Sequence, residues 1–110
     1  MALEKTIRFG GVPLGYHRVQ DVQVVTNAFA QVTIASYFDA AAHAEEVAAR
    51  DARERDIAGW QEGDPAPTEV PDNVARRWSV STDGPANDMD VSGAYAWLKT
   101  LPEFEGCKDA

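Results

Sequence analysis

Several residue types that support common protein chemistries are scarce in this sequence. Cysteine occurs once, at Cys107, so a disulfide within the chain is impossible and a zinc site built on thiolates is nearly so. No apolar run approaches the roughly 20 residues that a membrane-spanning helix needs. The first residues, Met1 to Lys5, contain no apolar segment of the kind found in signal peptides. We therefore expect a protein that is made in a cytoplasm and stays soluble.

Basic residues are also few, with 10 Lys and Arg against 18 Asp and Glu, which gives a net charge of −8. This balance argues against unassisted binding to nucleic acid or to an anionic membrane surface, since both need clustered positive charge. The expected partners are therefore other proteins. A length of 110 residues predicts one domain, and 45% hydrophobic with 25% charged residues is typical of a globular one.

The first 38 residues carry the alternating pattern of β-strands. Leu3, Ile7 and Phe9 share one face of a short strand, and residues 10–15 read as a glycine-rich loop. Residues 16–25 and 29–38 predict an antiparallel hairpin joined by a turn at Thr26 and Asn27.

Within the first strand of this hairpin the alternation slips, because Val19 and Val22 fall on opposite faces. A bulge near Asp21 would bring them to one face. A strand end that is buried on both faces would also explain the pattern.

The middle of the chain predicts a helix over residues 40–58, with Asp39 as its N-cap and an alanine-rich composition. Its acids and bases are spaced for i,i+4 pairs such as Glu46 with Arg50. The only large apolar residues near it are Val47, Ile57 and Trp60, so it can dock only shallowly on its own sheet. Two alternatives remain open: a solvated helix covering a sheet edge, or an arm that gains its burial from a neighbouring subunit. Three prolines make the rest of the segment, up to residue 73, a loop.

The last part of the chain predicts a strand over residues 76–82 and a helix over residues 88–101 that ends at Pro102. An apolar stripe at helical spacing indicates that this helix packs on the sheet; its residues are Val91, Ala94, Tyr95, Leu98 and Leu101. The fold class predicted from the whole pattern is α+β: a small antiparallel β-sheet or sandwich, a C-terminal helix packed on it, and an alanine-rich helical or extended insertion. We expect Trp78, Tyr95, Leu98, Leu101 and Phe104 to form its core and a C-terminal clasp.

Residue patterns for catalysis, cofactors and metals are missing. The two histidines, His17 and His43, lie in a predicted strand and a predicted helix, and no Gly-x-Ser-x-Gly turn presents a serine. The loop at residues 10–15 does not match a phosphate-binding motif. Asp83, Asn87, Asp88 and Asp90 could suggest calcium, but the order of a calcium loop is absent and a turn with an N-cap carboxylate explains them. The sequence therefore predicts no enzyme, no cofactor and no metal.

Surface tryptophan is the remaining signal. Trp97 lies beside the apolar stripe of the last helix, so it either faces outward or borders the core. Exposed tryptophans are common anchors of protein interfaces. Together with Val47, Ile57 and Trp60, Trp97 is a candidate interface residue.

The C-terminal segment, Tyr-x-x-Leu-Lys-Thr-Leu-Pro-Glu-Phe-x-Gly over residues 95–106, resembles the ending of small proteins encoded among the tail-tip and tail-fibre genes of long-tailed bacteriophages. The hairpin followed by a lone strand also resembles their layout, whereas the alanine-rich stretch is longer than their usual connection. The resemblance implies a structural subunit of the virion tail that contacts other tail proteins or copies of itself and is oligomeric in the particle.

Three other functions fit the composition. A head decoration protein would look similar. A small acidic effector that mimics DNA needs a continuous anionic face, which Arg50, Arg53 and the pair Arg76 and Arg77 interrupt. A carbohydrate-binding module would use exposed tryptophan.

Overall fold

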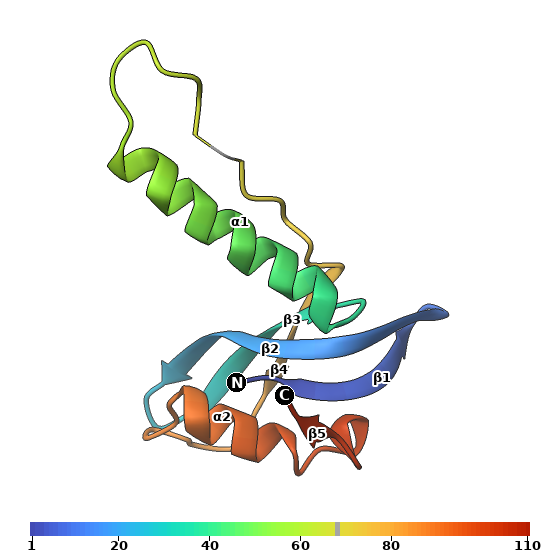
Figure 1. The fold of residues 1–110 in the computed structure, drawn as a ribbon. Coiled ribbons are helices and arrows are strands. Elements are labelled where there is room, and N and C mark those ends of the chain that lie inside the picture. The colour runs from blue at the N-terminus through green and yellow to red at the C-terminus, as the bar shows by residue number, and fades with distance from the viewer. Residues whose placement is uncertain (68) are drawn as a thin grey trace.

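A computed structural model describes residues 1–67 and 69–110. Within these residues the chain forms one antiparallel five-stranded sheet with two α-helices, which confirms the α+β class (Figure 1). In chain order the elements are β1 (Leu3–Phe9), β2 (Val12–Val25), β3 (Phe29–Tyr37), α1 (Ala40–Ala58), β4 (Arg76–Ser81), α2 (Val91–Leu98), the 3-10 turn η1 (Pro102–Phe104) and β5 (Lys108–Asp109). The strand order across the sheet is β4-β3-β2-β1-β5.

The connection between β1 and β2 is tighter than the loop predicted at residues 10–15. Only Gly10 and Gly11 turn the chain, with φ of 58° and 87°. Two consecutive residues with positive φ make the turn that matches the twist of a hairpin, and glycine adopts this conformation without strain. Pro13 is tolerated in β2 because β3 ends at Tyr37, opposite Tyr16, so this end of β2 has only β1 as a neighbour.

The predicted hairpin of β2 and β3 is present, and its turn places Asn27 at a φ of 59°. The register shifts between Val19 and Asp21, which confirms the predicted bulge. Because of this extra residue, Val19 and Val22 both pack into the core.

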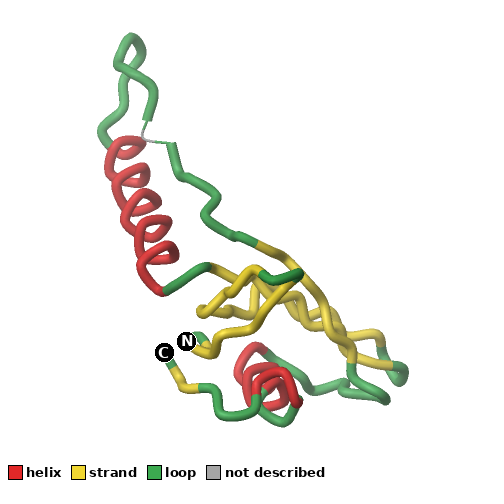
Figure 2. The backbone as a smooth tube through the Cα atoms, turned by 90° about the vertical axis from the view of Figure 1, so that its right-hand side faces the viewer, coloured by secondary structure: helices red, strands yellow, loops and turns green. Residues whose placement is uncertain are grey.

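The core lies between one face of the sheet and α2, which crosses it on the side opposite α1 (Figures 1 and 2). Its buried apolar residues come from all the layers that meet there: Leu3, Val19, Val32, Ile34, Ala94, Tyr95, Leu98 and Phe104. Trp78, Trp97 and Leu101 pack against this cluster while remaining half-buried. The hydroxyl of Tyr95 donates to the carbonyl of Met1 and accepts the backbone N–H of Val19.

The C-terminal clasp follows α2. Pro102 begins η1, and Phe104 is fully buried, stacked on Trp78 and meeting His17 edge-on. Beyond Gly106 the chain pairs with β1 as the short strand β5, and Lys99 forms a 2.6 Å ion pair with Asp109.

The segment between β3 and β4 projects from the rest of the molecule, and we call residues 39–75 the arm (Figures 1 and 2). It contains α1, whose bounds match the predicted helix and whose N-cap, Asp39, accepts the backbone N–H of Ala42. The molecule measures 54 × 34 × 23 Å and its radius of gyration is 16.9 Å, against about 13 Å for a compact chain of this length. The arm therefore makes the protein elongated.

Candidate functional site

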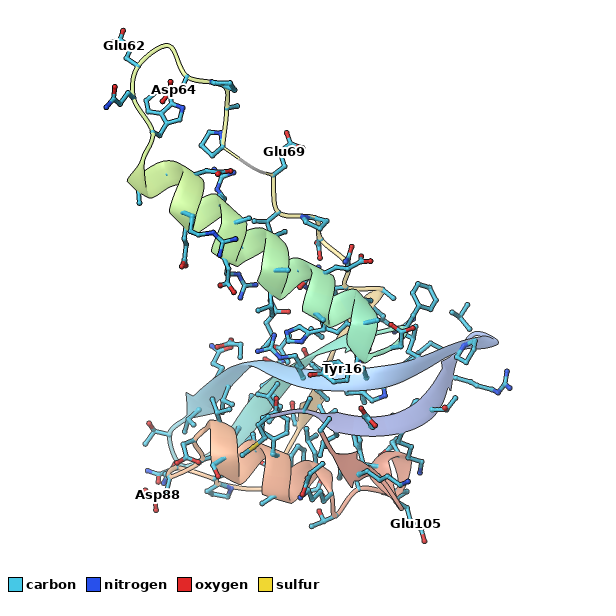
Figure 3. All side chains as sticks on the ribbon, in the orientation of Figure 1. Tyr16, Glu62, Asp64, Glu69, Asp88 and Glu105 are labelled. Atoms are coloured by element: carbon cyan, nitrogen blue, oxygen red, sulfur yellow. The ribbon has the colours of Figure 1, made fainter. Side chains whose placement is uncertain are left out.

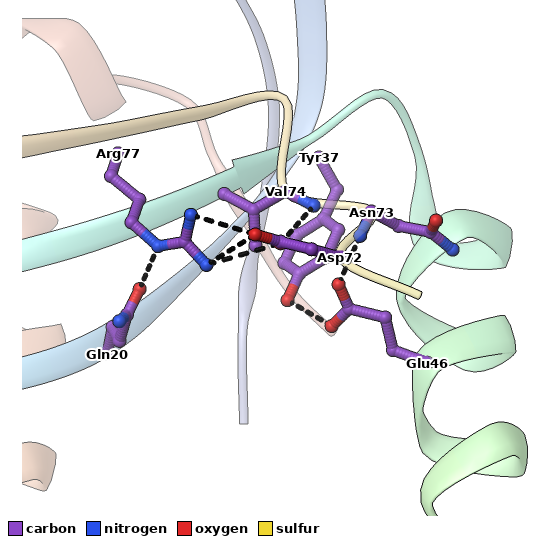
Figure 4. Close-up of polar contacts among 7 residues, drawn as sticks. All are labelled: Gln20, Tyr37, Glu46, Asp72, Asn73, Val74 and Arg77. Atoms are coloured by element: carbon purple, nitrogen blue, oxygen red, sulfur yellow. Dashed lines mark hydrogen bonds and ion pairs between the residues drawn. The ribbon is translucent and has the colours of Figure 1, made fainter. Parts of the chain in front are cut away.

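The base of the arm is fixed to the sheet through the carboxylate of Glu46. This side chain is 5% exposed, whereas carboxylates on helices normally stay in water. The hydroxyl of Tyr37 on β3 donates a 2.8 Å hydrogen bond to it, and the backbone N–H of Asn73 donates to its other oxygen (Figure 4). The expected pairing with Arg50 is replaced by these two bonds. Burial, and then the nearby Glu46 carboxylate, raise the pKa of Tyr37, so its hydroxyl keeps the proton that it donates.

Two further contacts hold the returning segment at the base. The side-chain N–H₂ of Asn73 donates to the carbonyl of Ala42 (2.9 Å) and to the carboxylate of Glu45 (3.2 Å). Asp72 accepts two guanidinium N–H groups of Arg77 on β4, and these bonds lower the pKa of its carboxyl (Figure 4). The base is therefore fixed through side chains of the helix, the returning segment and two strands.

Aromatic rings complete the base. The ring of His43 on α1 stacks on Tyr16 of β2, with centroids 5.3 Å apart, and meets Tyr37 edge-on. Burial lowers the pKa of His43, with a further contribution from the charge of Arg18. A neutral imidazole is the form that packs most easily between two phenol rings.

A groove of about 400 Å³ lies between the arm base and the sheet. Its polar lining consists of Arg18, Gln20, Tyr37, Glu46, Arg50, Asp72 and Arg77. Both acids already have partners, and the described lining contains no serine, threonine, cysteine or histidine. The hydroxyl in the described lining belongs to Tyr37, and it is held in the hydrogen bond to Glu46 that fixes the arm base.

The structure does bring one histidine and one serine together, a contact that sequence reasoning missed. Nδ1 of His17 lies 2.7 Å from Oγ of Ser36, and its Nε2 lies 2.8 Å from the carbonyl of Lys5. The indole N–H of Trp78 donates to the same Oγ at 2.8 Å. Both partners of the pair are buried, so no substrate can reach them. The sequence could have predicted this contact only from the pairing of His17 with Ser36 across β2 and β3, and that pairing depends on the position of the bulge.

The hydrogen bonds around this pair fit a neutral His17 that is protonated at Nε2. In that state Nε2–H donates to the Lys5 carbonyl, the Ser36 hydroxyl donates to Nδ1, and the Trp78 indole donates to Ser36. Burial lowers the pKa of His17, which agrees with a neutral ring. The network joins four strands inside the core, so its role is structural.

The arm tip, residues 57–67, carries the exposed apolar side chains that the sequence marked as interface candidates. Ile57 is 51% exposed and Trp60 46% exposed, and with Pro67 they line an open notch. The indole N–H of Trp60 donates to the carbonyl of Pro65, which fixes the ring over the loop. Asp64 accepts the N–H of Gln61 and closes a turn. Figure 3 shows Glu62 and Asp64 at this far end.

The remaining candidates are placed as follows. Val47 is exposed on α1, whereas Trp97 borders the core. Asp90 caps α2 by accepting the N–H of Gly93, and Asn87 bonds Asn27 across the hairpin turn. No group of three potential metal-ligating side chains occurs in residues 1–67 and 69–110, and no helix there is long and apolar enough to cross a membrane.

Comparison with known proteins adds no relative. No protein-family model, no curated protein and no solved structure matches this chain.

Proposed function

We propose that this protein is a non-enzymatic structural subunit of a bacteriophage virion, in the tail tip or baseplate, and that it acts through protein–protein contacts of its arm. The observation that carries the proposal is the arm itself, which leaves the sheet and exposes its apolar tip. The proposed location in a phage tail is based on the resemblance of residues 95–106 to the ending of tail-tip proteins.

The arm is not needed to close the sheet. Ser36 on β3 pairs with Arg76 on β4, and the N–H of Ala75 donates to the carbonyl of Ser36 at 2.9 Å. Strands that are already adjacent at this point can be joined by a turn of two residues. The long insertion therefore serves something other than strand pairing.

The arm also buries little of its own surface against the sheet. Glu46 is the one residue of α1 that is buried, and the helix surface is mostly alanine and charge. Most helices in proteins gain their stability from packing an apolar face, and α1 packs little of its surface on the sheet. The contacts at the base supply some, and a partner covering the tip supplies the rest.

Truncation of the outer arm tests the proposal. Residues 51–69 are removed and the ends joined by a short Gly-Asn-Gly linker, which keeps Glu46, Tyr37 and Asn73 in place. We expect an unchanged sheet by circular dichroism but loss of the protein from purified particles by mass spectrometry. Val91→Ser, outside the arm, is the control and should assemble normally. Val91 was predicted to belong to the apolar stripe of the last helix, but it begins α2 and is exposed.

Normal incorporation of the truncated chain would contradict the proposal. Mass spectrometry on separated heads and tails distinguishes a tail subunit from a head decoration protein. Absence from both would leave the acidic effector as the better hypothesis.

A further inference from the structure

Strand β4 lies at one edge of the sheet, and among the described strands its neighbour is β3 alone. The N–H of Thr82, just beyond the strand, donates to the carbonyl of Ala30 on β3 at 2.9 Å. In an antiparallel pair, residues that bond to the neighbouring strand alternate with residues whose backbone groups point away from it. Counting back from Thr82, the backbone groups that point away from β3 are those of Ser81, Ser79 and Arg77. The sheet leaves this outer row of N–H and C=O groups unpaired.

The connections to β4 leave its outer side open. The two helices lie over the faces of the sheet (Figures 1 and 2). The segment before β4 is bonded to α1 through Asn73, and the loop after it is bonded to Asn27 at the β2–β3 turn through Asn87. Both connections therefore turn inward over the sheet and do not run along the outer side of β4.

β4 also lacks the features that protect an edge strand from pairing with another chain. Natural edges are protected by charged side chains, proline or a bulge. Residues 78–81 contain no charge and no proline, and the register of β4 with β3 is continuous. The opposite edge is better protected, because β5 covers the start of β1 and the register of β1 shifts between Glu4 and Ile7.

The sequence of β4 is complementary to itself in the antiparallel direction. When Ser79 of one copy lies opposite Ser79 of another, Arg77 lies opposite Ser81 and Trp78 lies opposite Val80. All the outward-pointing backbone groups are then paired, whereas either neighbouring register leaves Ser81 or Arg77 without an opposite residue in β4. This register also brings the half-buried Trp78 and Val80 together on the core side of the sheet. Because the arginines of the two copies lie at opposite ends, no like charges face each other.

We infer that two copies of this chain pair through their β4 strands, antiparallel about Ser79, and form one continuous sheet. The same edge serves on both copies, so the dimer is two-fold symmetric and closes without growing further. This inference goes beyond the proposed function, because it concerns the sheet edge and leaves the arm for its own partner.

The contact is small, since one strand pair buries less than the roughly 1,200 Å² of a standard stable interface. We therefore expect a weak, reversible dimer that sedimentation of the full chain detects over roughly 10 μM to 1 mM.

Ser79→Pro tests the backbone pairing. It removes the outward N–H at the centre of the contact, whereas pairing with β3 uses no N–H from this residue, so the edge can accept proline. Each dimer loses two hydrogen bonds, and we expect binding at least about 10-fold weaker. Ser79→Ala keeps the N–H, so this matched control should associate like the wild type. Circular dichroism and thermal midpoints verify that both variants are folded.

A charge exchange tests the register without altering the backbone. Ser79→Lys and Ser79→Asp each place like charges opposite each other in a dimer, whereas a mixture of the two places opposite charges there. Ser79 is exposed, so both changes are compatible with the fold. The equimolar mixture should associate at least about 5-fold more tightly than either variant alone, and this advantage should fall with salt.

Three results would each overturn the inference: a chain that stays monomeric up to about 1 mM, Ser79→Pro associating as tightly as Ser79→Ala, or a mixture no tighter than its components. The variant without residues 51–69 should still dimerise. Loss of association in that variant would place the contact on the arm and overturn the pairing of β4, while the proposed function would stand.

Discussion

The hydrogen bond from Tyr37 to the buried Glu46 allows the attachment of the arm to be measured. Tyr37→Phe removes the donor and leaves the ring in place. A hydrogen bond to a charged group contributes about 1.5–3 kcal/mol, and the carboxylate that remains is still buried and has lost one of its two donors. We therefore expect the closed arm base to lose about 1.5–3 kcal/mol.

Hydrogen exchange of the Asn73 amide reports this loss directly, because that N–H is bonded to the same carboxylate. A change of 1.5–3 kcal/mol corresponds to roughly 10- to 150-fold faster exchange. Glu46→Gln and the double variant complete a thermodynamic cycle, in which the two changes should be coupled by about 1 kcal/mol or more.

The matched control is Tyr16→Phe, which makes the same chemical change on the same aromatic cluster without touching the carboxylate. Its Asn73 exchange should match that of the wild type. If Tyr37→Phe exchanges no faster than this control, Glu46 does not hold the arm and the assignment of the base is wrong.

Three further predictions follow from burial and charge. Leu98→Ala, at a fully buried position, should cost about 2–5 kcal/mol and lower the thermal midpoint by roughly 10–25 °C, while Val91→Ala shifts it by little. Burial lowers the pKa of His17 and His43, so their contribution to the free energy of unfolding is complete above the unfolded pKa of 6.5 and is lost as pH falls toward the folded values. Urea unfolding should therefore show stability declining between pH 7 and 5, by at most about 1.4 kcal/mol per pH unit for each histidine. A flat profile would contradict the assignment of neutral, buried rings to these two histidines. Arg77→Ala should change the free energy of unfolding by less than about 1 kcal/mol, since its partner Asp72 is exposed. A larger loss in thermal unfolding would show that the contact between Asp72 and Arg77 stabilises the whole domain.

Local signals were sufficient for much of the fold. Asp39 before an alanine-rich stretch fixes the start of α1, and the slip between Val19 and Val22 indicates the bulge, because both signals depend on neighbours along the chain. β5 was not predictable. It contains only Lys108 and Asp109, and it exists because β1, about 100 residues away in the chain, offers it a free edge.

The candidate site was predictable only in part. The exposed Ile57 and Trp60 follow from a helix without an apolar stripe. The buried Glu46 does not, since its spacing to Arg50 favours a solvated ion pair and its true partners come from β3 and from a loop 27 residues further on. The interface roles of Val47, Ile57, Trp60 and Trp97 remain predictions.

Placing the arm between β3 and β4 also influences the order in which the sheet can fold. β2 and β3 are joined by a short turn and can pair early, whereas β4 joins only after the ends of the whole arm meet. Closing that segment instead of a two-residue turn costs about 2–3 kcal/mol of chain entropy. Trp78 arrives with β4 and supplies the ring on which Phe104 stacks. The stacking of Phe104 on Trp78 can therefore form only after the ends of the arm have met, and a longer arm makes that step less favourable.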